Sequence, residues 1–440
     1  MVPIDKASGN VAFVCKRFYL KVLLDELGYG KATPNATYEQ VTTSVEDIKS
    51  KHIRFLTDKF KLKQLSSESK LPNIYWLPKM HKTPIKFRFI IAAPDCTIKP
   101  LAKSLTSIFS LFYKQIESYN KKCSFFSGVN TFWVIQNNQP VIKAIKKIND
   151  RRQGRSVETF DFSTLYTKIP HIKLTDVLCK MVDFCFSGGN SKSLLVNTFG
   201  ARWVENPRSA FVYTKKKVKL ALRYLMSNCY FTLGSKTFRQ IIGIPMGSDP
   251  APFFANLFLY YYESKWLRNI QKSDLSRARK FKSVFRFIDD LLSLNDGGEF
   301  SRSLSEIYPE ELELSKENVG TLSSSFLDIH IKLSDRQFSS KLFDKRDNFN
   351  FSIVRMPHTS STIPSAMVYS AFSAEILRIA RVTSALESFT KSAKDVVDRM
   401  AKQGADQRRM KNSIGRLYAK HLDDFCHITN DATILQDMFM

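Results

Sequence analysis

The stretch FRFIDDLLSL, residues 285–294, places two adjacent aspartates, Asp289 and Asp290, between two short apolar runs. FRFI and LLSL each have the composition of a β-strand, so the pattern predicts a hairpin with the carboxylates at its turn. Two like charges side by side are costly in apolar surroundings. Because Phe285 and Leu292 would lie in the core on either strand, the turn would be held rigidly, which suits a metal site.

A third carboxylate lies in a second predicted strand. VETFDFSTL, residues 157–165, is strand-like and carries Asp161, and apolar residues at helical spacing follow Pro170. If the two strands are neighbours in one sheet, Asp161, Asp289 and Asp290 converge. Such a cluster repels itself unless cations are present, and hard oxygen ligands select Mg²⁺, for which Mn²⁺ can substitute. Two such ions stabilise the attacking and leaving oxygens of a phosphoryl transfer, which is the chemistry of nucleotide polymerisation.

The composition favours a polyanionic partner. The chain has 440 residues, of which 43% are hydrophobic, and its 67 Lys and Arg against 41 Asp and Glu give a formal charge of +26. Nucleic acid is the leading partner, and an anionic membrane is the alternative. No stretch reaches the roughly 18–20 apolar residues that span a bilayer, and the amino terminus lacks a signal-peptide pattern. The seven cysteines form no CxxC pair, so we expect an intracellular protein with reduced thiols and no zinc site.

A pair of adjacent aspartates most often caps a helix or lies on a solvated turn, so other motifs must support a catalytic role. Three stretches resemble, in order, the A, B and C motifs of reverse transcriptases: FDFSTLYTKIPH (160–171), GIPMGSDPAPFFANL (243–257) and FRFIDDLLSL. Further stretches narrow the resemblance to Penelope-like retroelements, relatives of telomerase: VPIDKASGN (2–10), IYWLPKMHKTPIKFRFII (74–91), SFLDIHIKL (325–333) and HTSSTIPSAMVYSAFSAEILRIARVTS (358–384). The resemblance covers nearly the whole chain.

This resemblance implies an α+β right-hand polymerase with fingers, a palm built on an antiparallel sheet and a helical thumb. We expect an N-terminal segment at 1–59, fingers at 60–160, a palm with motifs A, B and C at 161–335, and a helical thumb with a short tail at 336–440. The implied activity is RNA-directed DNA polymerisation, in which a primer 3′-hydroxyl attacks the α-phosphate of a deoxynucleotide. The expected partners are an RNA template, a DNA primer and dNTPs, with two Mg²⁺ ions as cofactors.

The resemblance also assigns the centre of the site. Asp161, Asp289 and Asp290 match the family's metal-binding triad, and the backbone carbonyl of Phe162 is the expected additional ligand. Tyr166 matches the aromatic that blocks a ribose 2′-hydroxyl and so selects deoxynucleotides. The structural alternative for Tyr166 is a core aromatic.

The nucleotide would be held from two sides. Lys79 and Arg88 match fingers positions that grip the triphosphate, and Arg suits this role because its fork bonds phosphate oxygens bidentately. Gly243, Met246 and Gly247 match the turn before the motif B helix. Glycines there permit close backbone approach to the incoming base and the template.

Basic residues would hold the nucleic acid. Lys215, Lys216 and Lys217 in YTKKKVK would contact backbone phosphates, which carry no sequence information. The same run fits a nuclear-localisation pattern, although it belongs more readily to the fold and a basic run is usually a solvated face. We expect an intracellular protein with a nuclear location. Arg378 and Arg381 resemble thumb residues that hold a heteroduplex by its shape.

One further residue is a candidate general acid, and the sequence departs from the family's pattern at two points. Lys316 in ELELSKEN lies near where a family member could place a general acid for the leaving pyrophosphate. Phe287 stands where motif C more commonly has Tyr, which keeps the ring and loses one hydroxyl. Many Penelope-like elements continue into a GIY-YIG nuclease, which nothing in this sequence matches, so a separate nuclease would have to cleave the target.

Three alternatives remain open from the sequence. A DDE nuclease would use Asp161, Asp289 and either Glu313 or Glu317, but it explains neither Tyr166 nor the GIPMGS turn. A domesticated or decayed copy would bind nucleic acid without polymerising. A viral RNA-copying polymerase shares the palm, but its motif C usually has Gly where this chain has Ile288.

Overall fold

The computed structural model describes residues 1–29, 37–62, 69–163, 165–187, 193–205, 212–353 and 355–437. Thr164, inside the motif A stretch, lies outside these ranges. Within them, helices alternate with short strands, and the strands form sheets in which nearly all neighbours are antiparallel. This arrangement confirms the expected α+β class.

The element bounds are as follows. The strands are β1 (Val2–Ile4), β2 (Ala7–Ala12), β3 (Tyr38–Val41), β4 (Asn73–Lys79), β5 (Lys86–Ala92), β6 (Val157–Phe162), β7 (Ser193–Asn197), β8 (Gly200–Val204), β9 (Val212–Tyr213), β10 (Tyr230–Leu233), β11 (Lys236–Gln240), β12 (Val284–Phe287), β13 (Asp290–Leu294), β14 (Leu314–Lys316), β15 (Ser323–Phe326), β16 (Ile329–Ser334) and β17 (Gln337–Leu342). The helices are α1 (Lys16–Glu26), α2 (Val45–Phe60), α3 (Lys99–Ser127), α4 (Gln139–Asn149), α5 (Leu165–Lys168), α6 (His171–Ser187), α7 (Lys215–Ser227), α8 (Ala251–Ser273), α9 (Leu275–Lys280), η1 (Phe281–Ser283), α10 (Glu299–Ile307), η2 (Lys345–Asn348), α11 (Ser365–Val382), α12 (Leu386–Lys402), α13 (Gln407–Lys420), α14 (Leu422–Phe425) and α15 (Ala432–Asp437).

The sheet that carries the aspartates has the strand order β12-β13-β6-β14, with every neighbouring pair antiparallel. β6 reads VETFDF and is buried along most of its length, as its aromatic and β-branched residues favour. β12 and β13 form the predicted hairpin around the turn Ile288–Asp289. Asp289 thus lies in the turn, whereas Asp290 begins β13.

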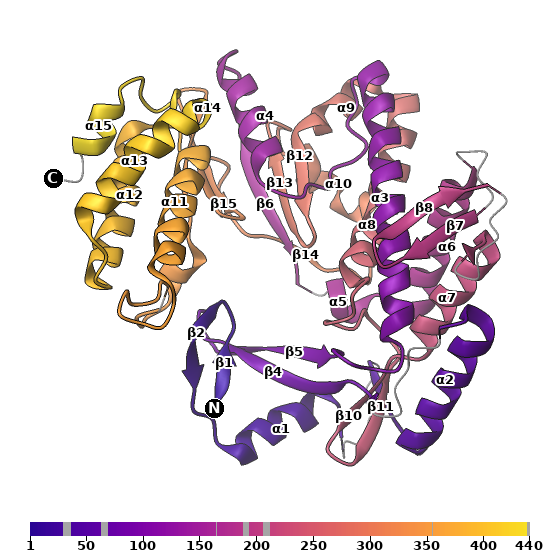
Figure 1. Ribbon diagram of the computed structural model, residues 1–440. Coiled ribbons are helices and arrows are strands. Elements are labelled where there is room, and N and C mark those ends of the chain that lie inside the picture. The colour runs from indigo at the N-terminus through magenta and orange to yellow at the C-terminus, as the bar shows by residue number, and fades with distance from the viewer. Residues whose placement is uncertain are drawn as a thin grey trace.

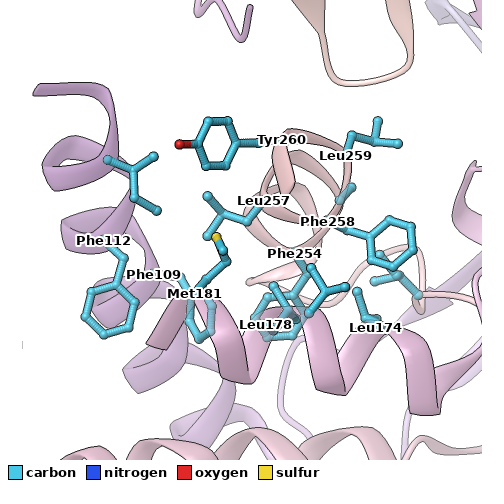
Figure 2. Close-up of a cluster of buried hydrophobic side chains, with 14 of the residues drawn as sticks. Phe109, Phe112, Leu174, Leu178, Met181, Phe254, Leu257, Phe258, Leu259 and Tyr260 are labelled. Atoms are coloured by element: carbon cyan, nitrogen blue, oxygen red, sulfur yellow. The ribbon is translucent and has the colours of Figure 1, made fainter. Parts of the chain in front are cut away.

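Helices α3, α6 and α8 pack on one another and form much of the main apolar core. Figure 2 shows Phe109 of α3, Leu174, Leu178 and Met181 of α6, and Phe254 of α8 gathered in this cluster. The rings of Phe109 and Phe254 meet edge to face, with centroids 5.0 Å apart. The three α6 residues recur at i, i+4 and i+7, which is the spacing of one helix face. This core supports the motif A strand and the motif B helix.

A second sheet, in the lower part of Figure 1, has the order β3-β11-β10-β4-β5. β10 and β11 come from between α7 and α8, yet they pair with strands from near the amino terminus: Thr232 lies opposite Asn73, and Thr237 lies opposite Val41. The expected boundary between 160 and 161 therefore does not coincide with the sheets, because residues 230–240 complete the fingers sheet.

The carboxy-terminal part also departs from the expected boundary at 335/336. β17 pairs with β16 in the three-stranded sheet β15-β16-β17, which shares an apolar cluster with the palm strands. Helices α11, α12 and α13 form a separate cluster that includes Phe372, Val396 and Ile414. Figure 1 shows this orange and yellow helical bundle next to the β15 end of the molecule.

Candidate active site

The structure brings the three aspartates together on neighbouring strands. β13 pairs with β6 so that Asp290 lies directly opposite Asp161. The amide of Phe162 donates a hydrogen bond of 3.3 Å to the carbonyl of Asp289. The end of the motif A strand is therefore tied to the motif C turn, and the two motifs present their carboxylates side by side.

The electrostatics of this cluster oppose full ionisation. Burial, with the charges of Asp289 and Asp161, raises the pKa of Asp290 to about 6, and the ammonium of Lys345 opposes this rise. Burial raises the pKa of Asp161 as well, with Asp289 and then Glu317 adding to the effect. Like charges at close range disfavour the ionised forms, so a bound cation would relieve the repulsion.

The donor set fits magnesium in type and charge. All three side chains offer hard carboxylate oxygens, which is what Mg²⁺ binds in polymerase-type sites. Within the described ranges, no group of three or more His, Cys, Asp or Glu side chains is gathered closely enough to hold one ion. The carboxylates would therefore have to change rotamer for all three to reach a common cation.

A buried arginine supports the turn that carries Asp289. The guanidinium of Arg286 is fully buried and bonds both carboxylate oxygens of Glu263, at 2.6 and 3.1 Å. It also donates to the side chain of Asn256 at 2.8 Å and to the carbonyl of Ile288 at 3.1 Å. Tyr308 donates to Glu263 at 2.9 Å. Because Asn256 and Glu263 lie on α8, this network joins the motif B helix to the motif C turn.

The motif B turn touches both motif A and the fingers through backbone atoms. The amide of Ile244 donates to the Tyr166 carbonyl at 2.8 Å, and the amide of Ile91 donates to the Met246 carbonyl at 2.9 Å. A Cβ at Gly243 would lie 2.4 Å from the Tyr166 carbonyl oxygen, and one at Gly247 would lie 2.5 Å from that of Ile91. The glycines thus permit close approach of protein backbone, a role that the sequence motif did not reveal.

Tyr166 lies beside the carboxylates and is partly buried against the main core. Burial and the negative charge of Asp289 raise the pKa of its hydroxyl to about 12. Tyr166 is therefore partly exposed and lies in the field of Asp289.

The fingers residues Lys79 and Arg88 face the same region. Burial, with the charge of Arg88, lowers the pKa of Lys79, and Asp161 is among the charges that oppose this change. Arg88 forms an ion pair with Asp5 at 3.0 Å, which the sequence did not predict. The positive charges of two further lysines oppose the rise in the aspartate pKa values. Lys82 lowers the pKa of Asp161, and Lys345 lowers those of both Asp161 and Asp290.

Lys316 lies on the other face of the palm sheet, which corrects the expectation of a general acid there. It pairs in register with Phe160, whereas its neighbour Ser315 pairs with Asp161. Side chains alternate between faces along a strand, so Lys316 points away from Asp161. Its ammonium is bound to Glu158 on that opposite face. Glu317, the residue that follows β14, carries a negative charge that raises the pKa of Asp161. It was expected to bind metal only in the nuclease alternative.

The basic residues expected to hold nucleic acid are largely engaged within the protein. Lys217 donates to the Val212 carbonyl at 2.9 Å, and Lys215 lies 3.6 Å from a carboxylate oxygen of Asp183, while Lys216 is exposed. In the thumb, Arg378 pairs with Asp328 at 2.9 Å and Arg381 pairs with Asp424 at 2.8 Å. The two thumb arginines therefore brace α11 in this structure instead of presenting unpaired guanidinium groups.

Known structures share this architecture at low sequence identity. Telomerase from Candida albicans, solved in complex with the TWJ fragment of telomeric RNA, superposes with a TM-score of 0.56 at 11% identity, over 92% of this chain and 70% of its own. Apo telomerase from Candida tropicalis gives a TM-score of 0.54 at 10% identity, over 97% of this chain and 70% of its own. No family model matches the sequence, and no curated protein does.

The chain therefore has a right-hand polymerase fold, as its motifs predicted. Within that class its fold is similar to that of telomerase. None of the helices that the structure describes has both the length and the apolar character to cross a membrane.

Proposed function

We propose that this chain is an RNA-directed DNA polymerase. The observation that carries the proposal is the pairing of Asp161 with Asp290 next to the Gly243–Gly247 turn, inside a right-hand polymerase fold. The telomerase neighbour that was solved with telomeric RNA supports an RNA template. The expected DNA primer and dNTP partners follow from the same reaction.

Each group of residues would have its own role in the reaction. Asp161, Asp289 and Asp290, with the Phe162 carbonyl, would hold two Mg²⁺ ions, which supply charge stabilisation at the attacking and leaving oxygens. Tyr166 would exclude a ribose 2′-hydroxyl. The fingers cations would hold the phosphates of the dNTP, and the Arg286 network keeps the DD turn in place.

We also propose the family to which this polymerase belongs. Motifs spread from VPIDKASGN to the ILRIAR helix support membership of the Penelope-like retroelements, relatives of telomerase. A nuclear location and a separate nuclease for target cleavage belong to the same proposal.

Extension of a DNA primer on an RNA template with Mg²⁺ tests this function, with dNTPs compared against ribonucleotides. Asp289→Ala should reduce the rate by roughly 10²–10³-fold or more, as expected when a group that stabilises transition-state charge is lost. Asp58→Ala is the matched control, because Asp58 is 61% exposed on α2, which carries none of the A, B and C motifs. Equal activity of Asp289→Ala would remove the triad assignment. Hybrid binding without extension on several templates would favour the non-enzymatic alternative.

A further inference from the structure

The amino-terminal hairpin reaches the candidate active site. β1 and β2 are joined by the turn Asp5–Lys6, where Lys6 has a left-handed φ of 63°. The amide of Asp5 donates to the Pro78 carbonyl at 3.1 Å, which fixes the turn against the fingers strand β4. The next residue of that strand is Lys79. The turn is therefore placed by the same strand that carries an expected phosphate ligand.

Asp5 is a buried carboxylate whose ion-pair partner is Arg88. The Asp5 side chain is 5% exposed, and its Oδ1 lies 3.0 Å from a guanidinium nitrogen of Arg88. Its Oδ2 has no hydrogen-bond partner among the described residues. Burying a carboxylate is costly unless it is paired, so this ion pair orients both groups. Arg88 keeps 37% of its side chain exposed, so it is not fully enclosed by this pairing.

Lys6 is one of three cations here that come from separate segments and act on one another electrostatically. Its ammonium lies in the field of Asp290 and also in the fields of Lys345 and Arg88, while burial lowers its pKa. The segment that carries Lys345 is held against the hairpin, because Asn10 donates to the Ser352 carbonyl at 3.0 Å.

The same segment also contacts the loop between the two fingers strands. The rings of His81 and Phe349 have centroids 5.4 Å apart. The amino-terminal hairpin, the fingers hairpin and the η2 segment thus place Arg88 and Lys345 in the field of Lys6, and Lys6 and Lys345 in the field of Asp290.

We propose that the Asp5–Lys6 turn forms part of the site for the incoming nucleotide's phosphates, where Lys6 contacts the phosphates and Asp5 positions Arg88. The inference rests on the proposed function and adds residues from outside the recognised A, B and C motifs. Its chemistry is that of polyphosphate recognition: the Arg88 fork bonds phosphate oxygens, and Lys6 adds a compact positive charge. A nucleotide would place its negative charge between these cations and the metal-binding carboxylates.

Steady-state primer extension at varied dNTP concentration tests the inference with four variants. Lys6→Gln and Asp5→Asn should each raise KM for dNTP about tenfold and change kcat less. Lys6→Arg should restore most of the loss, because it keeps the charge. Lys21→Gln, on the exposed face of α1, should match the unaltered protein. The affinity for primer–template should be unchanged in all four, and thermal unfolding should confirm that each variant is folded.

A second readout separates this inference from the proposed function. Equilibrium binding of Mg²⁺·dNTP is measured on a complex with a 3′-dideoxy-terminated primer, so that no chemistry occurs. If the unaltered protein binds dNTP but never extends a primer, and Lys6→Gln weakens binding about tenfold, the polymerase function fails and the inference stands. An unchanged KM and Kd in Lys6→Gln would overturn the inference alone. Absence of dNTP binding by the unaltered protein would overturn both.

Discussion

The guanidinium of Arg286 holds a residue in an unfavourable conformation. Ile288 has a φ of 56°, a left-handed value that costs an L-residue roughly 1–2 kcal/mol and is rare for a β-branched side chain. Arg286 donates a hydrogen bond to the carbonyl of this residue, immediately before Asp289. This contact ties the buried Arg286–Glu263 pair to the turn that carries Asp289.

Removing one partner of the Arg286–Glu263 pair should be strongly destabilising. Arg286→Met should lower the free energy of unfolding by about 3–5 kcal/mol, because it leaves Glu263 buried and unpaired. Urea denaturation of both single variants and of the Arg286→Met, Glu263→Met double variant measures the coupling. The double variant should lose less than the sum of the singles, and strict additivity would show that the pair is not coupled. Lys168→Met, which breaks an exposed pair with Glu313, should cost under about 1 kcal/mol.

The raised pKa of Asp290 predicts a stability effect with a definite sign. Because its folded pKa of about 6 exceeds the ordinary 3.8, the folded state binds more protons between those values, and stability falls as pH rises through that window. Metal-free Asp290→Asn should therefore be more stable than the unaltered protein at pH 7.5, by on the order of 1–3 kcal/mol. The difference should vanish near pH 4 and shrink when Mg²⁺ is added. Thermal unfolding with and without chelator measures it.

The control for this prediction is Asp335→Asn. Asp335 is an exposed hairpin residue with a φ of 48°, so the same substitution there tests the chemistry of the change without the carboxylate cluster. If Asp290→Asn were no more stable than this control at pH 7.5, the proposed repulsion at the site would be wrong.

Sequence reasoning brought the triad together but missed Lys6 and Lys345, for a physical reason. Asp161, Asp289 and Asp290 follow strand patterns, and pairing of those strands is enough to bring them together. Lys6 and Lys345 reach the site from segments whose local patterns say nothing of where they dock. Lys316 was misplaced because its face of the sheet depends on register, and a shift of one residue inverts every side chain.

At the scale of elements, the turn before α8 is where the fingers meet the palm. Its backbone bonds to β5 through Met246 and Ile91, and to motif A through Ile244 and Tyr166. Both contacts depend on glycines with positive φ, Gly243 at 89° and Gly247 at 108°. The turn therefore couples β5 of the fingers to the motif A segment beside the aspartates.

Comparing Gly247→Ala with Gly200→Ala should separate two costs to stability. One is the steric clash of a Cβ with neighbouring backbone, and the other is the strain of a positive φ. Both glycines have strongly positive φ, but a Cβ at Gly247 would lie 2.5 Å from the Ile91 carbonyl oxygen, whereas one at Gly200 would have nothing within 4 Å. We expect Gly247→Ala to lose at least about 2 kcal/mol more stability than Gly200→Ala in denaturant unfolding. Equal losses would mean that the turn can move away from β5 without cost.

The sequence predicted individual strands and helices better than it predicted which strands pair with one another. The strands β6, β12 and β13 and the helix α6 follow from local sequence patterns, α8 follows from the motif B resemblance, and the structure contains all five. The fingers sheet could not be predicted, because β10 and β11 carry ordinary strand patterns that do not specify pairing with β3 and β4. The expected contiguous boundaries failed to match the sheets for the same reason.

At the scale of the whole molecule, the chain carries a formal charge of +26. Arg378, Arg381 and Lys217 are engaged within the protein, whereas Lys216 is exposed, so the first three contribute to the overall positive field more than to direct contacts in this structure. Such a field accelerates encounter with polyanions and is screened by salt.

Binding of an RNA–DNA hybrid should therefore weaken steeply with salt. A protein that neutralises about six or more phosphates loses roughly 10³-fold in affinity between 50 and 200 mM salt. Fluorescence anisotropy over this range measures the slope of log K against log salt. Arg381→Gln, which removes a paired arginine, should leave the slope nearly unchanged, whereas a slope that fell by a full unit would restore Arg381 as a phosphate contact.

The crossing of β10 and β11 into the fingers sheet has a consequence for biogenesis. Tyr38–Val41 can find its partner strand only after Lys236–Gln240 has been synthesised, so the fingers sheet depends on contacts distant in sequence. Such contacts form slowly and leave strand edges unpaired during synthesis. A ribosome-bound chain that has exposed only its first 160 residues should therefore be aggregation-prone and in need of a chaperone, and a truncation ending there should not yield a stable fingers domain.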